Sequence, residues 1–295
     1  MNKLKSILLT SLMLIATSAH AHYFWINSFE SSSHNGRDLM VSMGWGHGMP
    51  MGDMFNSVNG RISVRDFDLI SPSGDKSALS KPPFKPVDPD KTTDDAEIFS
   101  VDMGVNKIVL KKGAQEGAYQ VAAASEPTYY TQYKDKKGNM RLKMKAMDEI
   151  DGIAKVLLAI KYQAFAKSYI TNGKWEKPKA LGHGLEIVPR TDLSDVKVGD
   201  LVEVDVFFYG KPLSNSPQSR EFITAFSSNL GQADGFSLHS RLKKGKAQFR
   251  ALAAGQWMIN VMHVDKVTED GDLKDMVGKA RQVAHAATLT FNVKQ

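Results

Sequence analysis

Every second residue is large and apolar in the stretch Trp257-Met258-Ile259-Asn260-Val261-Met262-His263. Successive side chains of a β-strand point to opposite faces, so this alternation predicts a strand with Trp257 and His263 on the same face. Residues 285–293 place His285 and four apolar residues on one face in the same way. We expect these two strands to pair antiparallel, with His263 and His285 as cross-strand neighbours.

Short runs of branched and aromatic residues extend this pattern outward along the chain. Turn residues such as Gly210-Lys211-Pro212 and Lys244-Gly245-Lys246 separate the runs after Gly182. Gly, Pro, Asn and Asp separate similar runs between His22 and Ala124. The chain is therefore predicted to be mainly β, with β-sandwich units on both sides of its middle.

The middle of the chain has a different period. Apolar residues recur at three- and four-residue spacing between Arg141 and Ile160, namely Met144, Met147, Ile150, Ala154 and Leu157. This spacing predicts one amphipathic helix between the two β units. The predicted organisation is a signal peptide (1–21), an N-terminal β domain (22–125), a linking segment with the helix (126–180) and a C-terminal β-sandwich domain (181–295).

The first residues have the pattern of an export signal. Lys3 and Lys5 precede an apolar run from Ile7 to Ala16, and Ala19-His20-Ala21 fits a signal-peptidase site. Cleavage there makes His22 the first mature residue. Later residues contain no apolar run of membrane-spanning length, so we expect a periplasmic protein with no integral membrane segment in the mature chain.

Composition narrows the classes of function. The chain has no cysteine, which excludes disulfides and thiolate metal sites, and its formal charge of +6 is too mild and dispersed to predict nucleic-acid binding. It also lacks a Gly-x-Ser-x-Gly nucleophile elbow. A metal would have to be held by histidine, methionine, carboxylate or backbone groups.

Four histidines are the candidate metal ligands. An N-terminal His22 would offer an α-amine and an imidazole nitrogen together, and His47 projects from the loop Gly44-Trp45-Gly46-His47-Gly48-Met49. His263 and His285 either complete this site or are histidines at the edge of the core. The methionines that follow His47 are interpreted as an apolar contact surface, with cuprous-ion binding as the alternative.

Several motifs follow one another in a characteristic order: Ala19-His20-Ala21-His22-Tyr23-Phe24-Trp25, Gly44-Trp45-Gly46-His47, Tyr162-Gln163-Ala164-Phe165-Ala166-Lys167-Ser168-Tyr169, Gly184-Leu185-Glu186-Ile187-Val188-Pro189, Val198-Gly199-Asp200 and Tyr209-Gly210-Lys211-Pro212-Leu213. This order resembles an exported family of domains of unknown function associated with nickel and cobalt uptake, whose members resemble NikK-like periplasmic components of energy-coupling-factor transporters. The resemblance implies a transthyretin-like or Cna-B-like C-terminal part. The methionine-rich residues after His47 depart from the acidic continuation of nickel-type members, which keeps copper as an alternative metal.

Three functions are compatible with these features. The favoured one is a periplasmic protein that binds nickel or cobalt and hands it to a transporter, without enzymatic activity. The second is a copper oxidative enzyme of the histidine-brace kind, because an N-terminal histidine and a second histidine form such sites. The third is a metal-free β-sandwich binding or adhesion module, which leaves the position of His22 unexplained.

Overall fold

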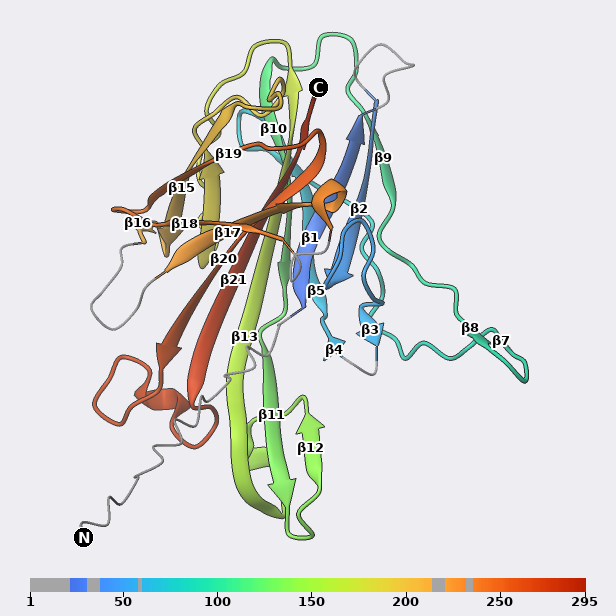
Figure 1. Ribbon diagram of the computed structural model, residues 1–295, viewed down its shortest axis with the longest axis vertical. Coiled ribbons are helices and arrows are strands. Elements are labelled where there is room, and N and C mark those ends of the chain that lie inside the picture. Colours follow the sequence, from blue (N-terminus) through green and yellow to red (C-terminus); the bar gives the residue numbers. More distant parts are fainter. Residues whose placement is uncertain (1–21, 31–37, 58–59, 214–220, 232–235) are drawn as a thin grey trace, which may run out of the picture.

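One large, twisted β-sheet runs through the computed structural model, which describes residues 22–30, 38–57, 60–213, 221–231 and 236–295 (Figure 1). Its ten strands include the path β18–β17–β20–β21–β13–β10–β5–β6, and β11 and β12 continue the sheet along the other part of β13. Every pair is antiparallel except β13 with β21. The strands are β5 (Val64–Ile70), β6 (Lys76–Ala78), β10 (Gly117–Ser125), β11 (Thr128–Asp135), β12 (Met140–Lys143), β13 (Ile153–Asn172), β17 (Phe222–Ser227), β18 (Leu238–Arg241), β20 (Gly255–Lys266) and β21 (Gln282–Val293).

A smaller sheet covers each face of the large one. Strands β1 (Tyr23–Glu30), β2 (Asp38–Gly46) and β9 (Asn106–Val109) form the N-terminal cover. Strands β14 (Leu185–Pro189), β15 (Leu201–Phe208), β16 (Lys211–Pro212) and β19 (Lys246–Arg250) form the C-terminal cover. The two remaining small ribbons pair β3 (Asn56–Ser57) with β4 (Gly60–Arg61), and β7 (Lys91–Thr92) with β8 (Glu97–Ile98).

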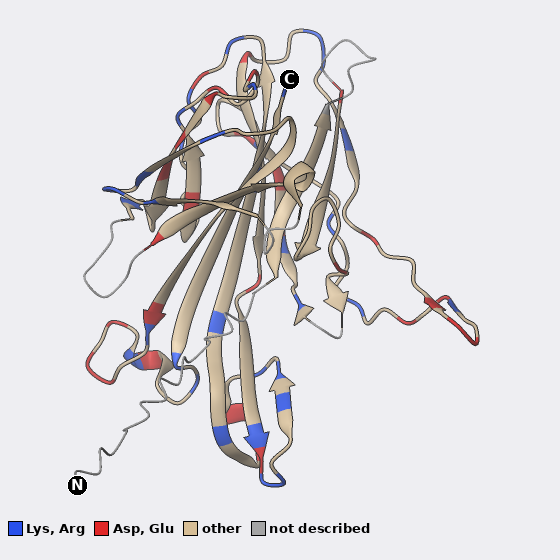
Figure 2. Cartoon of the chain, in the orientation of Figure 1, with Lys and Arg blue, Asp and Glu red and all other residues tan. Residues whose placement is uncertain are grey.

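Two apolar cores lie on opposite faces of the large sheet. Along β21, Ala284 and Ala286 belong to the core beneath the N-terminal cover, whereas Ala287 and Leu289 belong to the core beneath the C-terminal cover. Burial on both faces explains why every residue of β10 is buried. Figure 2 shows charged residues mainly in loops and at strand ends, because the middle of the large sheet is covered on both sides. The mainly β fold class predicted from the sequence is confirmed.

The N-terminal cover is tied to the large sheet by side chains. Alternate residues of β21 donate hydrogen bonds to alternate carbonyls of β1: Thr288 to Phe24 (2.6 Å), Thr290 to Ile26, and Asn292 to Ser28 (2.9 Å). These bonds satisfy backbone groups on the edge of β1 that does not pair with β2. The start of β1, and hence His22, is held against the sheet.

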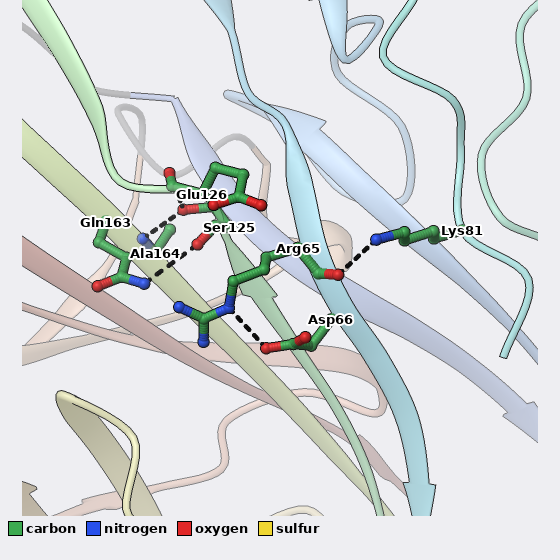
Figure 3. A network of polar contacts seen from close by, with 7 residues as sticks. All are labelled: Arg65, Asp66, Lys81, Ser125, Glu126, Gln163 and Ala164. Atoms are coloured by element: carbon green, nitrogen blue, oxygen red, sulfur yellow. Dashed lines mark hydrogen bonds and ion pairs between the residues drawn. The ribbon is translucent and has the colours of Figure 1, made fainter. Parts of the chain in front are cut away.

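The end of β10 is joined to β13 by a local polar network (Figure 3). The register between β10 and β5 shifts at Ala124/Ser125. The Ser125 hydroxyl accepts a hydrogen bond from the Ala164 amide at 2.9 Å, and the Gln163 side chain donates to the Ser125 carbonyl at 3.1 Å (Figure 3). These bonds satisfy polar groups where the regular ladder is interrupted.

The predicted pairing near the C-terminus is confirmed. Residues 257–263 lie in β20 and residues 285–293 lie in β21, and the two strands pair antiparallel. His263 lies directly opposite His285. The alternation of apolar residues was sufficient to predict this pairing, because each strand has one continuous apolar face.

The predicted amphipathic helix is wrong. Residues 141–160 form β12, a single 3-10 turn η1 (Met147–Glu149) and the first part of β13, and the only other helical elements among the described residues are η2 (Ser228–Leu230) and η3 (Lys274–Met276). The register between β11 and β13 shifts twice, so Leu157 and Ala154 fall between paired residues. These irregularities interrupt the period of two within β13. Met144, Met147 and Ile150 lie in and around the 3-10 turn that precedes β13, so the helical spacing arises from two different local structures.

The predicted linking segment, 126–180, supplies β11, β12 and β13 to the large sheet. Strands from both predicted β domains join the same sheet on the two sides of β13. The domain boundaries themselves stay a prediction. The predicted signal peptide lies outside the described residues, and within the described part no helix is long and apolar enough to cross a membrane.

Candidate functional site

His22 and His47 lie next to each other, with their ring centroids 4.5 Å apart. His22 immediately precedes β1, and His47 immediately follows β2. The two strands pair antiparallel with Tyr23 opposite Gly46, so the residue before one strand meets the residue after the other. The first two sequence candidates are therefore brought together by one strand pair.

The loop that carries His47 also brings a carboxylate to His22. Gly46 has a φ of +122°, and a Cβ there would lie 2.8 Å from the Asp53 amide nitrogen. Only glycine accepts both this conformation and this close approach. The Asp53 amide donates to the Trp45 carbonyl at 2.7 Å, which closes the loop and leaves Asp53 Oδ2 3.5 Å from His22 Nε2.

Trp45 and Gly60 confine the His22 ring. The imidazole stacks on Trp45 with ring centroids 4.9 Å apart and planes 15° apart. Gly60 approaches from the side, and a Cβ there would lie 3.0 Å from His22 Cε1. Trp45 Nε1 donates to the Gly60 carbonyl at 3.2 Å, so the indole holds this backbone in place.

The electrostatics of the site keep His22 neutral. Burial of the ring lowers the pKa of His22, and repulsion from a protonated His47 lowers it further, against the opposing effect of Asp53. A neutral imidazole presents a nitrogen lone pair, which is the form that binds a metal. His47 itself is exposed to solvent.

These residues line an open recess with a volume of about 690 Å³, whose walls are His22, His47, Gly48, Met49, Met51, Gly52, Asp53, Phe226, Ser228 and Gly231. Met49 packs against the buried cluster of Trp25, Phe226 and Met258, in keeping with its interpretation as an apolar contact. Met51 is 69% exposed. The recess is open enough for an ion to reach His22 and His47 from solvent.

The donor set suits a borderline divalent metal. It contains two imidazoles and one carboxylate, and imidazole binds nickel, cobalt, copper and zinc well. Within the described residues, no group of three or more histidine and acidic side chains is already arranged as a metal-binding site. Binding would therefore require a rotation of Asp53 or His47, or a further donor.

His263 and His285 belong to a different environment. His263 Nδ1 lies 2.8 Å from Glu221 Oε1, and its Nε2 lies 3.1 Å from the Asp265 carboxylate. His285 Nε2 lies 3.1 Å from the Tyr209 hydroxyl. Both rings contact Phe208, with centroids 4.4 and 5.3 Å away.

The expectation that this pair completes the site of His22 and His47 is wrong. Met262 and Val264 pack on the core beneath the N-terminal cover and line a cavity together with His22. His263 lies between them in the strand and points to the other face, and His285 contacts the same Phe208 as His263 on that face. The large sheet therefore separates the two histidine pairs.

Asp53 is the site residue that sequence reasoning did not select. It lies in the glycine- and methionine-rich loop after His47, and its carboxylate was the one acidic group there. Its place in the sequence does not show that the loop folds back, because this depends on the bridge between Trp45 and Asp53. A carboxylate a few residues beyond a candidate histidine is the signal that could have found it.

Comparison with known proteins identifies the family. The model of the family described as "Domain of unknown function (DUF4198)" matches residues 19–265, so the chain belongs to this family. No curated protein matched the chain. Among solved structures, fibronectin(III)-like modules of Clostridium thermocellum CbhA match at 12% identity over 92% of this chain and 94% of that chain, with a TM-score of 0.20. A TM-score this low supports no functional inference.

Proposed function

We propose that this member of the DUF4198 family binds a divalent transition metal in the periplasm through His22 and His47, and hands it to an uptake transporter. Nickel or cobalt is the proposed cargo, with copper as the alternative, and a transporter of the energy-coupling-factor type is the proposed partner. The observation that carries the metal site is the convergence of two imidazoles, with centroids 4.5 Å apart, beside the Asp53 carboxylate.

The surroundings of His22 favour a ligand role over a packing role. Its Nε2 lies 3.5 Å from Asp53 Oδ2, which is long for a hydrogen bond. The lowered pKa of His22 leaves its ring neutral near neutral pH, so little competition from protons opposes the metal. Stacking on Trp45 holds the ring without occupying its nitrogens.

Export would add a further donor to this site. Cleavage after Ala21 frees the α-amine of His22, which can chelate one metal ion together with the imidazole of the same residue. The amine, two imidazoles and Asp53 then supply up to four donors. Handing over the ion requires moderate affinity and access from solvent, and the recess beside His47 is open.

The test uses exported, processed protein with His22 at its N-terminus. Its native metal content is measured first, and the metal-free protein is then titrated with nickel, cobalt and copper. Insertion of one Ala before His22, and separately His47→Ala, should each weaken binding at least about tenfold. His239→Ala is the matched control, because this exposed histidine contacts Ser237 and Phe222 away from the site.

The outcomes separate the candidate functions. Nickel or cobalt without catalytic turnover supports the proposal. Copper with peroxide-dependent turnover would favour a histidine-brace oxidative enzyme, whereas absence of binding for all three metals would overturn the metal site and favour a metal-free binding module.

A further inference from the structure

A second cavity, more apolar than the recess, also has His22 in its wall. Its volume is about 550 Å³, within the range of small-molecule sites in proteins. Its walls come from β11, β12, β13, β20 and β21, with Trp45 and His22 at one end. In Figure 1, β11, β12 and the first part of β13 extend to the lower end of the large sheet.

The walls of this cavity are apolar and aromatic. Leu158 and Ile160 of β13 and Met262 and Val264 of β20 line it, and all four are only partly buried. Aromatic rings of Trp45, Tyr130 and Tyr162 complete the lining. No lysine, arginine, aspartate or glutamate is among the described residues that line it. A neutral molecule is therefore the occupant that these walls match, because an ion would lose its hydration without gaining a partner.

Tyr162 supplies a hydroxyl group to this cavity. The residue is only 6% exposed, and its hydroxyl forms no hydrogen bond with any described residue, in contrast to Tyr130, whose hydroxyl donates to the Arg61 carbonyl. Burial raises the pKa of Tyr162, so the hydroxyl remains protonated and available as a donor. Because Tyr162 lines the cavity, an oxygen atom of a bound molecule can accept a hydrogen bond from its hydroxyl.

Two side-chain amides add to this polar set. Gln132 of β11 and Gln282 of β21 line the same cavity, and neither side chain forms a hydrogen bond within the described part of the chain. A few polar groups in an otherwise apolar pocket orient a ligand rather than attract it.

We propose that this cavity binds an uncharged, ring-containing organic molecule that carries an oxygen acceptor, and that Tyr162 donates a hydrogen bond to this oxygen. The site is independent of metal binding, because it needs neither His47 nor the α-amine of His22. His22 nevertheless forms part of the wall of both the cavity and the metal recess. A bound molecule therefore contacts one of the proposed metal ligands.

The probe for this site is Prodan, an uncharged naphthalene that carries a ketone and whose emission shifts to the blue in an apolar environment. Processed, metal-free protein should bind it saturably with a stoichiometry of one. Tyr162→Phe keeps the ring and removes the hydroxyl, so it should weaken binding about tenfold, the loss expected for one hydrogen bond to a buried acceptor. Tyr129→Phe is the matched control, since Tyr129 lies outside the cavity and contacts Met276.

A second pair of variants tests the cavity without relying on the hydroxyl. Leu158→Glu places a carboxylate in the wall and should abolish binding, whereas Leu157→Glu alters the adjacent, exposed residue that does not line the cavity and should leave it unchanged. Circular dichroism checks the fold of both. If Leu158→Glu does not fold, Tyr162→Phe decides.

The proposal is overturned if wild-type protein gives no saturable blue shift, or if Tyr162→Phe binds Prodan as tightly as wild type. Concentration-dependent dimerisation that Leu158→Glu abolishes, without probe binding, would assign the apolar walls to a second copy of the chain and likewise overturn it. Failure of metal binding in the titrations above leaves these results unaffected, so the two proposals are tested separately.

Discussion

The two histidine pairs of this protein differ in what their ring nitrogens contact. His263 has a carboxylate at each nitrogen, and His285 has the Tyr209 hydroxyl. His22 has one long contact to Asp53, and its faces rather than its nitrogens are used, by Trp45 and His47. Both nitrogens of His263 and Nε2 of His285 are thus engaged within the protein, although Nδ1 of His285 is buried without a partner among the described residues. The His22 ring is held by its faces, which leaves its nitrogens for a ligand.

The surroundings of the two histidine pairs differ as well. The C-terminal core buries a whole polar network: Lys167 Nζ lies 2.6 Å from Glu186 Oε1, both side chains are at most 3% exposed, and Glu186 also accepts from the amides of Leu181 and Gly182. The recess at His22 and His47 is open to solvent. Variants on the two sides of the large sheet should therefore change different properties, namely stability on one side and ligand binding on the other.

The largest expected effect is on the stability of the C-terminal side. Lys167→Met leaves Glu186 buried without its cation and should lower the free energy of unfolding by about 3–5 kcal/mol. Denaturant unfolding of the metal-free protein measures this loss. Lys294→Met is the control, because its ion pair with Asp195 is exposed to solvent and should contribute far less to stability. Equal losses for the two variants would show that breaking the buried Lys167–Glu186 ion pair destabilises the fold no more than breaking an exposed one.

The second prediction compares one substitution in each histidine pair. His285→Ala removes a buried ring and leaves a cavity, so it should cost about 2 kcal/mol of stability and leave metal affinity unchanged. His47→Ala should do the reverse, with less than about 0.5 kcal/mol of stability lost because the residue is exposed. Calorimetric titration and thermal unfolding of both variants provide the comparison. A loss of metal affinity in His285→Ala would contradict the separation of the two sites.

The third prediction concerns the pH dependence of stability. Burial, and then repulsion from His263, lowers the pKa of His285 to about 4; burial, and then Lys167, lowers the pKa of His183 to about 4. The unfolded chain binds these protons from about pH 6.5 downward, so their contribution is complete above that pH and is lost as the pH falls toward 4. Each histidine should lower the free energy of unfolding by about 1.4 kcal/mol per pH unit in this window.

Thermal unfolding between pH 7 and pH 4.5 measures this slope. His285→Gln removes one titrating group and should flatten the curve, whereas His239→Gln, which changes an exposed histidine, should leave it as in wild type. An unchanged slope in His285→Gln would show that His285 is protonated in the folded protein at these pH values.

The smallest expected effect concerns the Asp53 carboxylate in the recess. Asp53→Asn keeps the size of the side chain and removes its charge, so metal affinity should fall by about tenfold or less while the stability of the metal-free protein stays close to wild type. The same titrations measure it. If affinity is unchanged, Asp53 positions the loop through its backbone and takes no part in binding the ion.

The site shows how far sequence patterns reach. Export motifs and a glycine-rich loop selected His22 and His47 separately, and the pairing of β1 with β2 then brought them together. Asp53 was not selected because its approach to His22 depends on the bridge to Trp45. The cavity at Tyr162 could not be foreseen, since its walls combine residues from the start, the middle and the end of the chain.

Alternation of apolar residues by itself determined that the chain is mainly β and that His263 lies opposite His285, because a strand's side-chain direction follows from local backbone geometry. Tertiary structure alone decided that residues 153–160 begin the long strand β13 instead of ending a helix, and that His263 and His22 lie on opposite faces of the sheet. These features depend on register shifts and on which sheet covers which face. Both follow from packing between distant segments, which a local period does not record.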